Sequence, residues 1–172
     1  MKKLRLFINF IPALVVMSII FGLSLQTGEA STETTGALSN SIAGALAIDP
    51  GASTDTSTPY DLGGEVIWQI NLLIRSLAHV LAFGGLGLMM MLGCTLSKFN
   101  AKWHLGITLG LGSIIAFIDE TIKYFIPGRH FSWIDMGKDI VGLILAVIGC
   151  WILSLLYNAY ISRRRPSTPP TV

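Results

Sequence analysis

The chain has 172 residues, of which 52% are hydrophobic and only 13% are charged. Soluble domains carry about 25% charged residues, so this composition favours an integral membrane protein. The formal net charge of +2 is too small to indicate a nucleic-acid-binding protein, and the basic residues are not interleaved with aromatic ones.

Four apolar segments are long enough to cross a bilayer, because a membrane helix needs about 20 mostly apolar residues. The first follows Lys2, Lys3 and Arg5. It is longer than the h-region of a signal peptide, which holds about 7–15 residues, so we expect a retained helix. The sequence therefore predicts an all-α fold, an integral membrane four-helix bundle. The predicted spans are residues 6–25, 77–96, 103–122 and 140–161.

A long segment rich in Ser, Thr, Gly and Pro, residues 26–71, separates the first two spans. Within it, Leu38, Ile42, Ala45 and Leu46 recur at helical spacing. They predict a short amphipathic helix in this first extracytoplasmic loop, on the membrane surface or over the bundle. Such a helix could be a lid over an outward-facing pocket or a surface helix that merely packs there. A helical lead-in to the second span is predicted by Val66, Ile67, Ile70 and Ile74.

The distribution of charge predicts the orientation. With the N-terminus in the cytoplasm, most basic residues fall inside and all ten acidic residues fall outside. This is the positive-inside pattern of a multi-pass protein of the bacterial inner membrane with both termini cytoplasmic. We predict one transmembrane domain over residues 1–162 and a basic, Pro-rich, disordered cytoplasmic tail over residues 163–172. The basic residues placed inside are Lys2, Lys3, Arg5, Lys98, Lys102 and Arg163 to Arg165.

Small residues in the spans suggest close packing. Gly106 and Gly110 form a GxxxG pattern in the third span, which lets another helix approach closely. The pattern fits packing inside the bundle or a homo-oligomer formed with a second copy. Cys94 and Cys150 both lie in apolar runs, so we expect buried small side chains rather than a disulfide.

Charged residues gather at the outer ends of three spans. Arg75 and His79 are four apart and share one face of a helix, while Asp119 and Glu120 end the third span. Charged side chains near a bilayer are costly, so a group of them at one depth is a functional-site hypothesis. Structural ion pairing that only fixes the bundle is the alternative. The predicted binding residues are Arg75, His79, Asp119, Glu120, Arg129, Asp135 and Asp139.

These residue types suggest several kinds of chemistry. Arg75 or Arg129 would hold a phosphate or carboxylate, and Arg129 could also fork onto a carboxylate of the chain. His79 is a candidate for proton transfer with Asp119 or Glu120. The acids with His79 could also hold a divalent cation. However, no HExxH or clustered Cys/His spacing appears, so we predict neither a metal site nor a cofactor.

Four segments resemble motifs of VanZ-like membrane proteins in their order and spacing. They are FGLSLQ at 21–26, RSLAH at 75–79 with the glycine-containing FGGLG at 83–87, DETIKYFIPGR at 119–129 and DMGKDIVG at 135–142. The third is similar to the family's DExxQxFxPGR block, except that Lys123 stands where the family usually has glutamine. The resemblance covers residues 21–142, most of the chain.

The resemblance implies a small multispanning bacterial protein. Because the family's namesake is associated with low-level resistance to the glycopeptide teicoplanin, it also implies a role in antibiotic resistance. It supports the topology and the site residues more than it names a reaction.

We expect a cell-envelope protein whose outward-facing polar site engages a lipid headgroup, a lipid-linked cell-wall precursor or a lipid-anchored glycopeptide. The alternative is a membrane-embedded hydrolase or transferase acting on a lipid-linked substrate, with His79 and Asp119 or Glu120 as acid–base groups. No committed nucleophile is visible, so we favour binding over catalysis. A proton-coupled transporter ranks last, because the spans are polar only at their outer ends.

Overall fold

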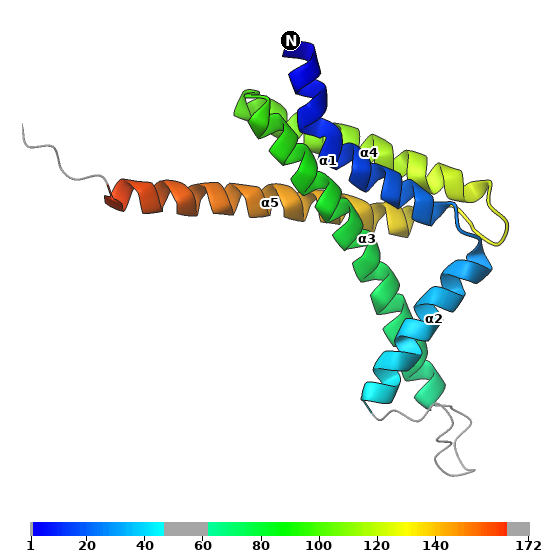
Figure 1. Cartoon of the computed structure of the whole chain (residues 1–172). Coiled ribbons are helices and arrows are strands. Elements are labelled where there is room, and N and C mark those ends of the chain that lie inside the picture. The colour runs from blue at the N-terminus through cyan, green and yellow to red at the C-terminus, as the bar shows by residue number, and fades with distance from the viewer. Residues whose placement is uncertain (1, 47–61, 165–172) are drawn as a thin grey trace, which may run out of the picture.

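The computed structural model describes residues 2–46 and 62–164, which form five helices and no strand (Figure 1). Four of the helices are long and apolar enough to cross a membrane. The predicted all-α fold with four spans is therefore confirmed. The helices are α1 (Lys2–Ser24), α2 (Gly28–Ala45), α3 (Leu62–Leu96), α4 (Ala101–Tyr124) and α5 (Trp133–Arg164).

The candidate spans agree with the prediction at the first and third segments to within two residues, at Arg5–Ser24 and Lys102–Tyr124. The second begins at Glu65 rather than at residue 77, because the predicted helical lead-in is continuous with it. The fourth begins at Trp133 rather than at residue 140. The earlier start has a local cause, since the Ser132 hydroxyl accepts a hydrogen bond from the Asp135 amide at 3.1 Å and so caps the helix.

Helix α3 organises the fold, because it contacts each of the other four helices and packs most extensively against α5. Figure 1 shows the two helices crossing near the middle of α3. At this crossing, a Cβ atom on Gly142 would lie 2.4 Å from the Val80 carbonyl oxygen, so only glycine permits the approach. A core forms around the crossing and includes Ala13, Ile20, Phe83, Leu86, Met90, Ala116 and Leu143.

The helix predicted in the first extracytoplasmic loop is present as α2, but it is longer and packs through a different face. It begins after Thr27, whose hydroxyl accepts a hydrogen bond from the Ala30 amide at 3.3 Å. Ser39 and Ala43 are buried, whereas Leu38 and Leu46 are exposed. Small side chains therefore let α2 approach α3, its partner in Figure 1, and the apolar stripe faces outward. The rest of the predicted loop, residues 47–61, lies outside the described residues.

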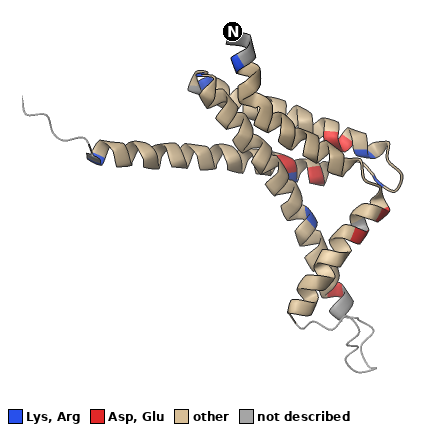
Figure 2. Cartoon of the chain, in the orientation of Figure 1, with Lys and Arg blue, Asp and Glu red and all other residues tan. Residues whose placement is uncertain are grey.

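Charge is segregated along the molecule. Figure 2 shows basic residues at the α3–α4 turn and at the far end of α5. The described acidic residues lie on α2, at the start of α3, toward the end of α4 and in the first turns of α5, where other basic residues accompany them. Lys98 and Lys102 lie at the α3–α4 turn, and α5 continues through Arg164. The remainder of the predicted tail, residues 165–172, lies outside the described part of the chain.

Large apolar surfaces remain uncovered by the described part of the chain. In α5, every residue from Trp151 to Arg163 is exposed, and Figure 1 shows this half of the helix projecting from the rest. A Cβ atom added at Gly106 or Gly110 would meet no described atom within 4 Å, so these residues make no use of the GxxxG pattern for packing. Cys94 is fully buried and Cys150 partly so, and both are free thiols.

The α3–α5 crossing can be tested at Gly142. Alanine there would introduce a methyl group against the Val80 carbonyl. Because overpacking of this kind costs about 1–3 kcal/mol, we expect Gly142→Ala to lower the unfolding temperature in detergent micelles. Gly149→Ala is the matched control, since nothing lies within 4 Å of that position on the same helix. Equal unfolding temperatures for the two variants would contradict the close crossing.

Candidate functional site

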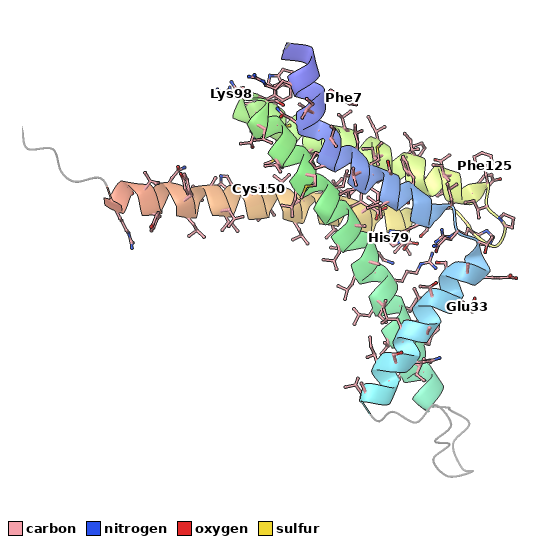
Figure 3. The ribbon with its side chains drawn as sticks, in the orientation of Figure 1. Phe7, Glu33, His79, Lys98, Phe125 and Cys150 are labelled. Atoms are coloured by element: carbon pink, nitrogen blue, oxygen red, sulfur yellow. The ribbon has the colours of Figure 1, made fainter. Side chains whose placement is uncertain are left out.

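His79 and Asp139 form the centre of the polar cluster. The α3–α5 crossing places His79 Nδ1 2.8 Å from Asp139 Oδ1, and Asp139 is fully buried. The His79 side chain keeps 14% of its surface exposed. Figure 3 shows it on the side of α3 near the first turns of α5. A buried carboxylate on Nδ1 fixes the ring and leaves Nε2 for another partner. The expected partners of His79, Asp119 and Glu120, are not bonded to it.

Lys123 joins two buried carboxylates at the end of α4. Its Nζ lies 2.9 Å from Asp119 Oδ2 and also bonds Glu120 Oε1. The other Glu120 oxygen accepts a hydrogen bond from the Ser132 amide at 3.1 Å. All three charged residues are almost completely buried. Because buried charges require partners, this triad fixes the end of α4 against the turn that leads into α5.

Arg75 is a partly accessible charge of the cluster and is much more exposed than its partner Asp135. Its Nη2 lies 3.5 Å from Asp135 Oδ2, and its side chain is 43% exposed. Asp135 is already bonded through Oδ1 to Lys138 Nζ at 2.7 Å. Arg75 forms no hydrogen bond with any residue in the two described ranges, so its guanidinium donors are available to a ligand.

Arg129 follows a tight turn in which Gly128 has a φ of +74°, a conformation that favours glycine. Its Nη1 donates to the Ser24 carbonyl oxygen at 2.8 Å, and its Nη2 donates to the Ser31 hydroxyl at 3.3 Å. A cation at a helix C-terminus is favourable, so Arg129 caps α1 instead of forking onto a carboxylate. Burial, and then the neighbouring charge of Arg75, lower the pKa of Arg129.

A cavity of about 250 Å³ lies between the end of α1, the start of α2, α3 and the end of α4. Ile20, Leu23, Ala82 and Phe83 form part of its apolar wall. The cavity is therefore amphipathic, with a charged region beside an apolar one. Its charged lining consists of Arg75, His79, Asp119, Lys123 and Arg129.

The structure brings all seven predicted site residues into one region, but only some of them line the cavity. Arg75, His79, Asp119 and Arg129 line the cavity, whereas Glu120, Asp135 and Asp139 lie behind it as partners of these charges. The sequence analysis did not include Lys123 and Lys138 among the site residues. Their spacing could have indicated the ion pairs, because Lys123 lies four residues after Asp119 and Lys138 lies three residues after Asp135.

One group could in principle ligate a cation. Single ligand atoms of His79, Glu120 and Asp139 lie within 4.8 Å of one another. However, Lys123 Nζ bonds Glu120 directly, and an ammonium at that position opposes a divalent cation. The expectation that the site holds no metal stays a prediction.

The charges of the cluster balance. The cluster contains four acidic and four basic side chains besides His79, so its formal charges balance when His79 is neutral. A balance of formal charge suits burial at the end of membrane-spanning helices, because an uncompensated buried charge is costly. The carboxylates are Asp119, Glu120, Asp135 and Asp139, and the cations are Arg75, Lys123, Arg129 and Lys138.

Removing Lys123 should destabilise the fold. Lys123→Met leaves two buried carboxylates without their cation, which costs about 3–5 kcal/mol in comparable buried pairs. We expect a large fall in the unfolding temperature in detergent and a smaller fall for Lys123→Gln, which keeps a hydrogen-bond donor. The exposed Lys102→Met is the control. Wild-type stability of Lys123→Met would show that the carboxylates do not need this partner.

Comparison with known proteins bears on the identity of the chain. The family model described as VanZ/LLP1 matches residues 9–156. Neither the curated proteins nor the solved structures gave a significant match. The matched region includes all four apolar helices at least in part, as well as every residue of the polar cluster. This multi-pass membrane protein therefore belongs to the VanZ/LLP1 family.

Proposed function

We propose that this protein acts at the bacterial cell envelope by engaging the charged headgroup of an amphiphile in its amphipathic cavity. The ligand is a membrane lipid, a lipid-linked cell-wall precursor or a lipid-anchored glycopeptide such as teicoplanin, and in the last case binding gives resistance. The observation that carries the proposal is that one cavity joins the available guanidinium of Arg75 to the apolar side chains of α1 and α3.

The apolar part of the cavity favours a ligand with a hydrocarbon portion. Ile20 and Leu23 come from α1, and Ala82 and Phe83 come from α3. Contact with these side chains removes apolar surface from water, which is favourable by about 25 cal/mol per Å². Binding pockets commonly combine such a lining with a few polar groups that orient the ligand.

The charged part favours an anionic group. Arg75 and Arg129 both line the cavity, and the charge of each disfavours that of the other. Arg129 is held by the end of α1, whereas Arg75 has no such hydrogen bonds among the described residues. A phosphate or carboxylate beside Arg75 would relieve the repulsion and accept charge-assisted hydrogen bonds.

The orientation follows from the segregation of charge. With the basic α3–α4 turn (Figure 2) and the end of α5 in the cytoplasm, the residues that line the cavity lie at the outer side of the inner membrane. Both termini are then cytoplasmic. This placement gives the site access to lipids and to lipid-anchored molecules of the cell envelope.

A second function, acid–base catalysis on a lipid-linked substrate, is favoured by the His79–Asp139 pair. A buried carboxylate on Nδ1 orients an imidazole for proton transfer at Nε2. Catalysis by hydrolysis or group transfer would also require a nucleophile, and His79 has no hydrogen bond to a serine or cysteine within the described ranges. In a hydrolysis, water would then be the nucleophile, and His79 would be the base that takes its proton.

The proposal is tested by glycopeptide susceptibility of bacteria that express the chain at matched membrane levels. We expect wild type to raise the inhibitory concentration of teicoplanin and Arg75→Gln to return it to the empty-vector value, because the anionic group loses its cation. Arg163→Gln, an exposed change at the far end of α5, is the control and should protect like wild type.

Two further variants separate binding from catalysis. His79→Gln keeps hydrogen-bonding groups but cannot transfer a proton, so protection should persist in part if the protein binds and vanish if it catalyses. Asp139→Asn should behave like His79→Gln in the catalytic case. If Arg75→Gln protects as well as wild type, the cavity is not the site of this function.

A further inference from the structure

One residue of the cavity lining has a buried carboxylate oxygen that no described residue satisfies. Asp119 is only 1% exposed and lines the cavity. Its Oδ2 forms an ion pair with Lys123 Nζ at 2.9 Å, but its Oδ1 has no hydrogen-bond partner among the described residues. Leaving a buried ionised oxygen without a donor is costly. A ligand that brings a hydrogen-bond donor to this oxygen would remove that cost.

Neighbouring cations do not supply that donor. Lys123 Nζ is already shared between Asp119 Oδ2 and Glu120 Oε1. Arg129 donates to the end of α1 and to Ser31. Asp139 Oδ2 also lacks a partner among the described residues, but Asp139 does not line the cavity. The ligand thus meets an acceptor at Asp119 and donors at Arg75.

We propose that the ligand's headgroup is zwitterionic, with an anionic group at Arg75 and a protonated amine that donates to Asp119 Oδ1. The inference rests on the proposed function and specifies its ligand class. A zwitterion also preserves the charge balance of the site, where four carboxylates meet four cations when His79 is neutral. A ligand with net charge would disturb that balance in a partly buried place.

Phosphatidylethanolamine is a membrane lipid with a zwitterionic headgroup of this kind. Its phosphate suits Arg75, its primary ammonium has N–H donors for Asp119, and its acyl chains suit the wall formed by Ile20, Leu23 and Phe83. Phosphatidylcholine carries a cation without N–H donors. Phosphatidylglycerol carries the phosphate without a cation. The three lipids therefore separate the hydrogen bond to Asp119 from the contact with Arg75.

The test measures binding of these three lipids, with identical acyl chains, to the full chain in detergent by native mass spectrometry. We expect phosphatidylethanolamine to bind about tenfold more tightly than either of the others, the effect of one charge-assisted hydrogen bond. Asp119→Asn should abolish the preference for phosphatidylethanolamine. Arg75→Gln should weaken the binding of phosphatidylethanolamine and of phosphatidylglycerol to the same extent. Glu33→Gln, an exposed acid on α2, should change nothing.

Soluble glycerophosphoethanolamine, a phosphate diester like the lipid, distinguishes a lipid from a free zwitterion. It has the same headgroup without acyl chains, so we expect it to compete at least about tenfold more weakly. Equal competition would overturn the assignment to a lipid and leave a soluble zwitterion as the ligand.

The outcomes also separate this inference from the proposed function. If wild type binds the three lipids equally and Arg75→Gln weakens all of them, the zwitterion inference is overturned while the amphiphile site stands. If Arg75→Gln has no effect on any lipid, both are overturned. The ranking by wild type decides the question even where Asp119→Asn fails to fold.

Discussion

The structure depends on the close crossing of α3 and α5, which glycine at position 142 permits. A side chain there would meet the Val80 carbonyl, so the two helix backbones could not touch. The crossing lies directly beside the polar cluster, because His79 precedes Val80 and Asp139 lies one turn before Gly142. Backbone contact therefore brings His79 Nδ1 within 2.8 Å of Asp139. Packing and site geometry share one cause, so disturbing the crossing also displaces the pair.

Burial of the cluster then limits what the site can do. Most of its charges are paired within the chain: Lys123 with Asp119 and Glu120, and Lys138 with Asp135. Among the described residues that line the cavity, three groups keep capacity for a ligand: the guanidinium of Arg75, the Nε2 atom of His79 and the Oδ1 atom of Asp119. Structural pairing and ligand binding are thus combined in one cluster, with buried partners that hold the cavity-lining residues in place. This division explains why only some of the charged residues face the cavity.

Much of this arrangement could be predicted from the sequence. The apolar runs indicated four spans, and the spacing of Arg75 and His79 placed both on one helix face. Both predictions succeed because the length of an apolar segment and the period of a helix are properties of the local sequence. The partner of His79 could not be found in this way, since Asp139 is 60 residues distant and reaches it only through the α3–α5 crossing. The face by which α2 packs was also missed. Leu38 and Leu46 follow the helical period, but Ser39 and Ala43 are the residues small enough for close contact with α3.

The central claim is that the cavity holds the headgroup of an amphiphile rather than a cluster of purely structural ion pairs. The most direct measurement is a structure of the full chain in nanodiscs that contain phosphatidylethanolamine, solved with a bound antibody fragment. The account predicts headgroup density between Arg75 and Asp119, with acyl-chain density along Phe83 and Leu23. A closed cavity would contradict it, with Arg75 fully bonded to Asp135 and a side chain of the protein on Asp119 Oδ1.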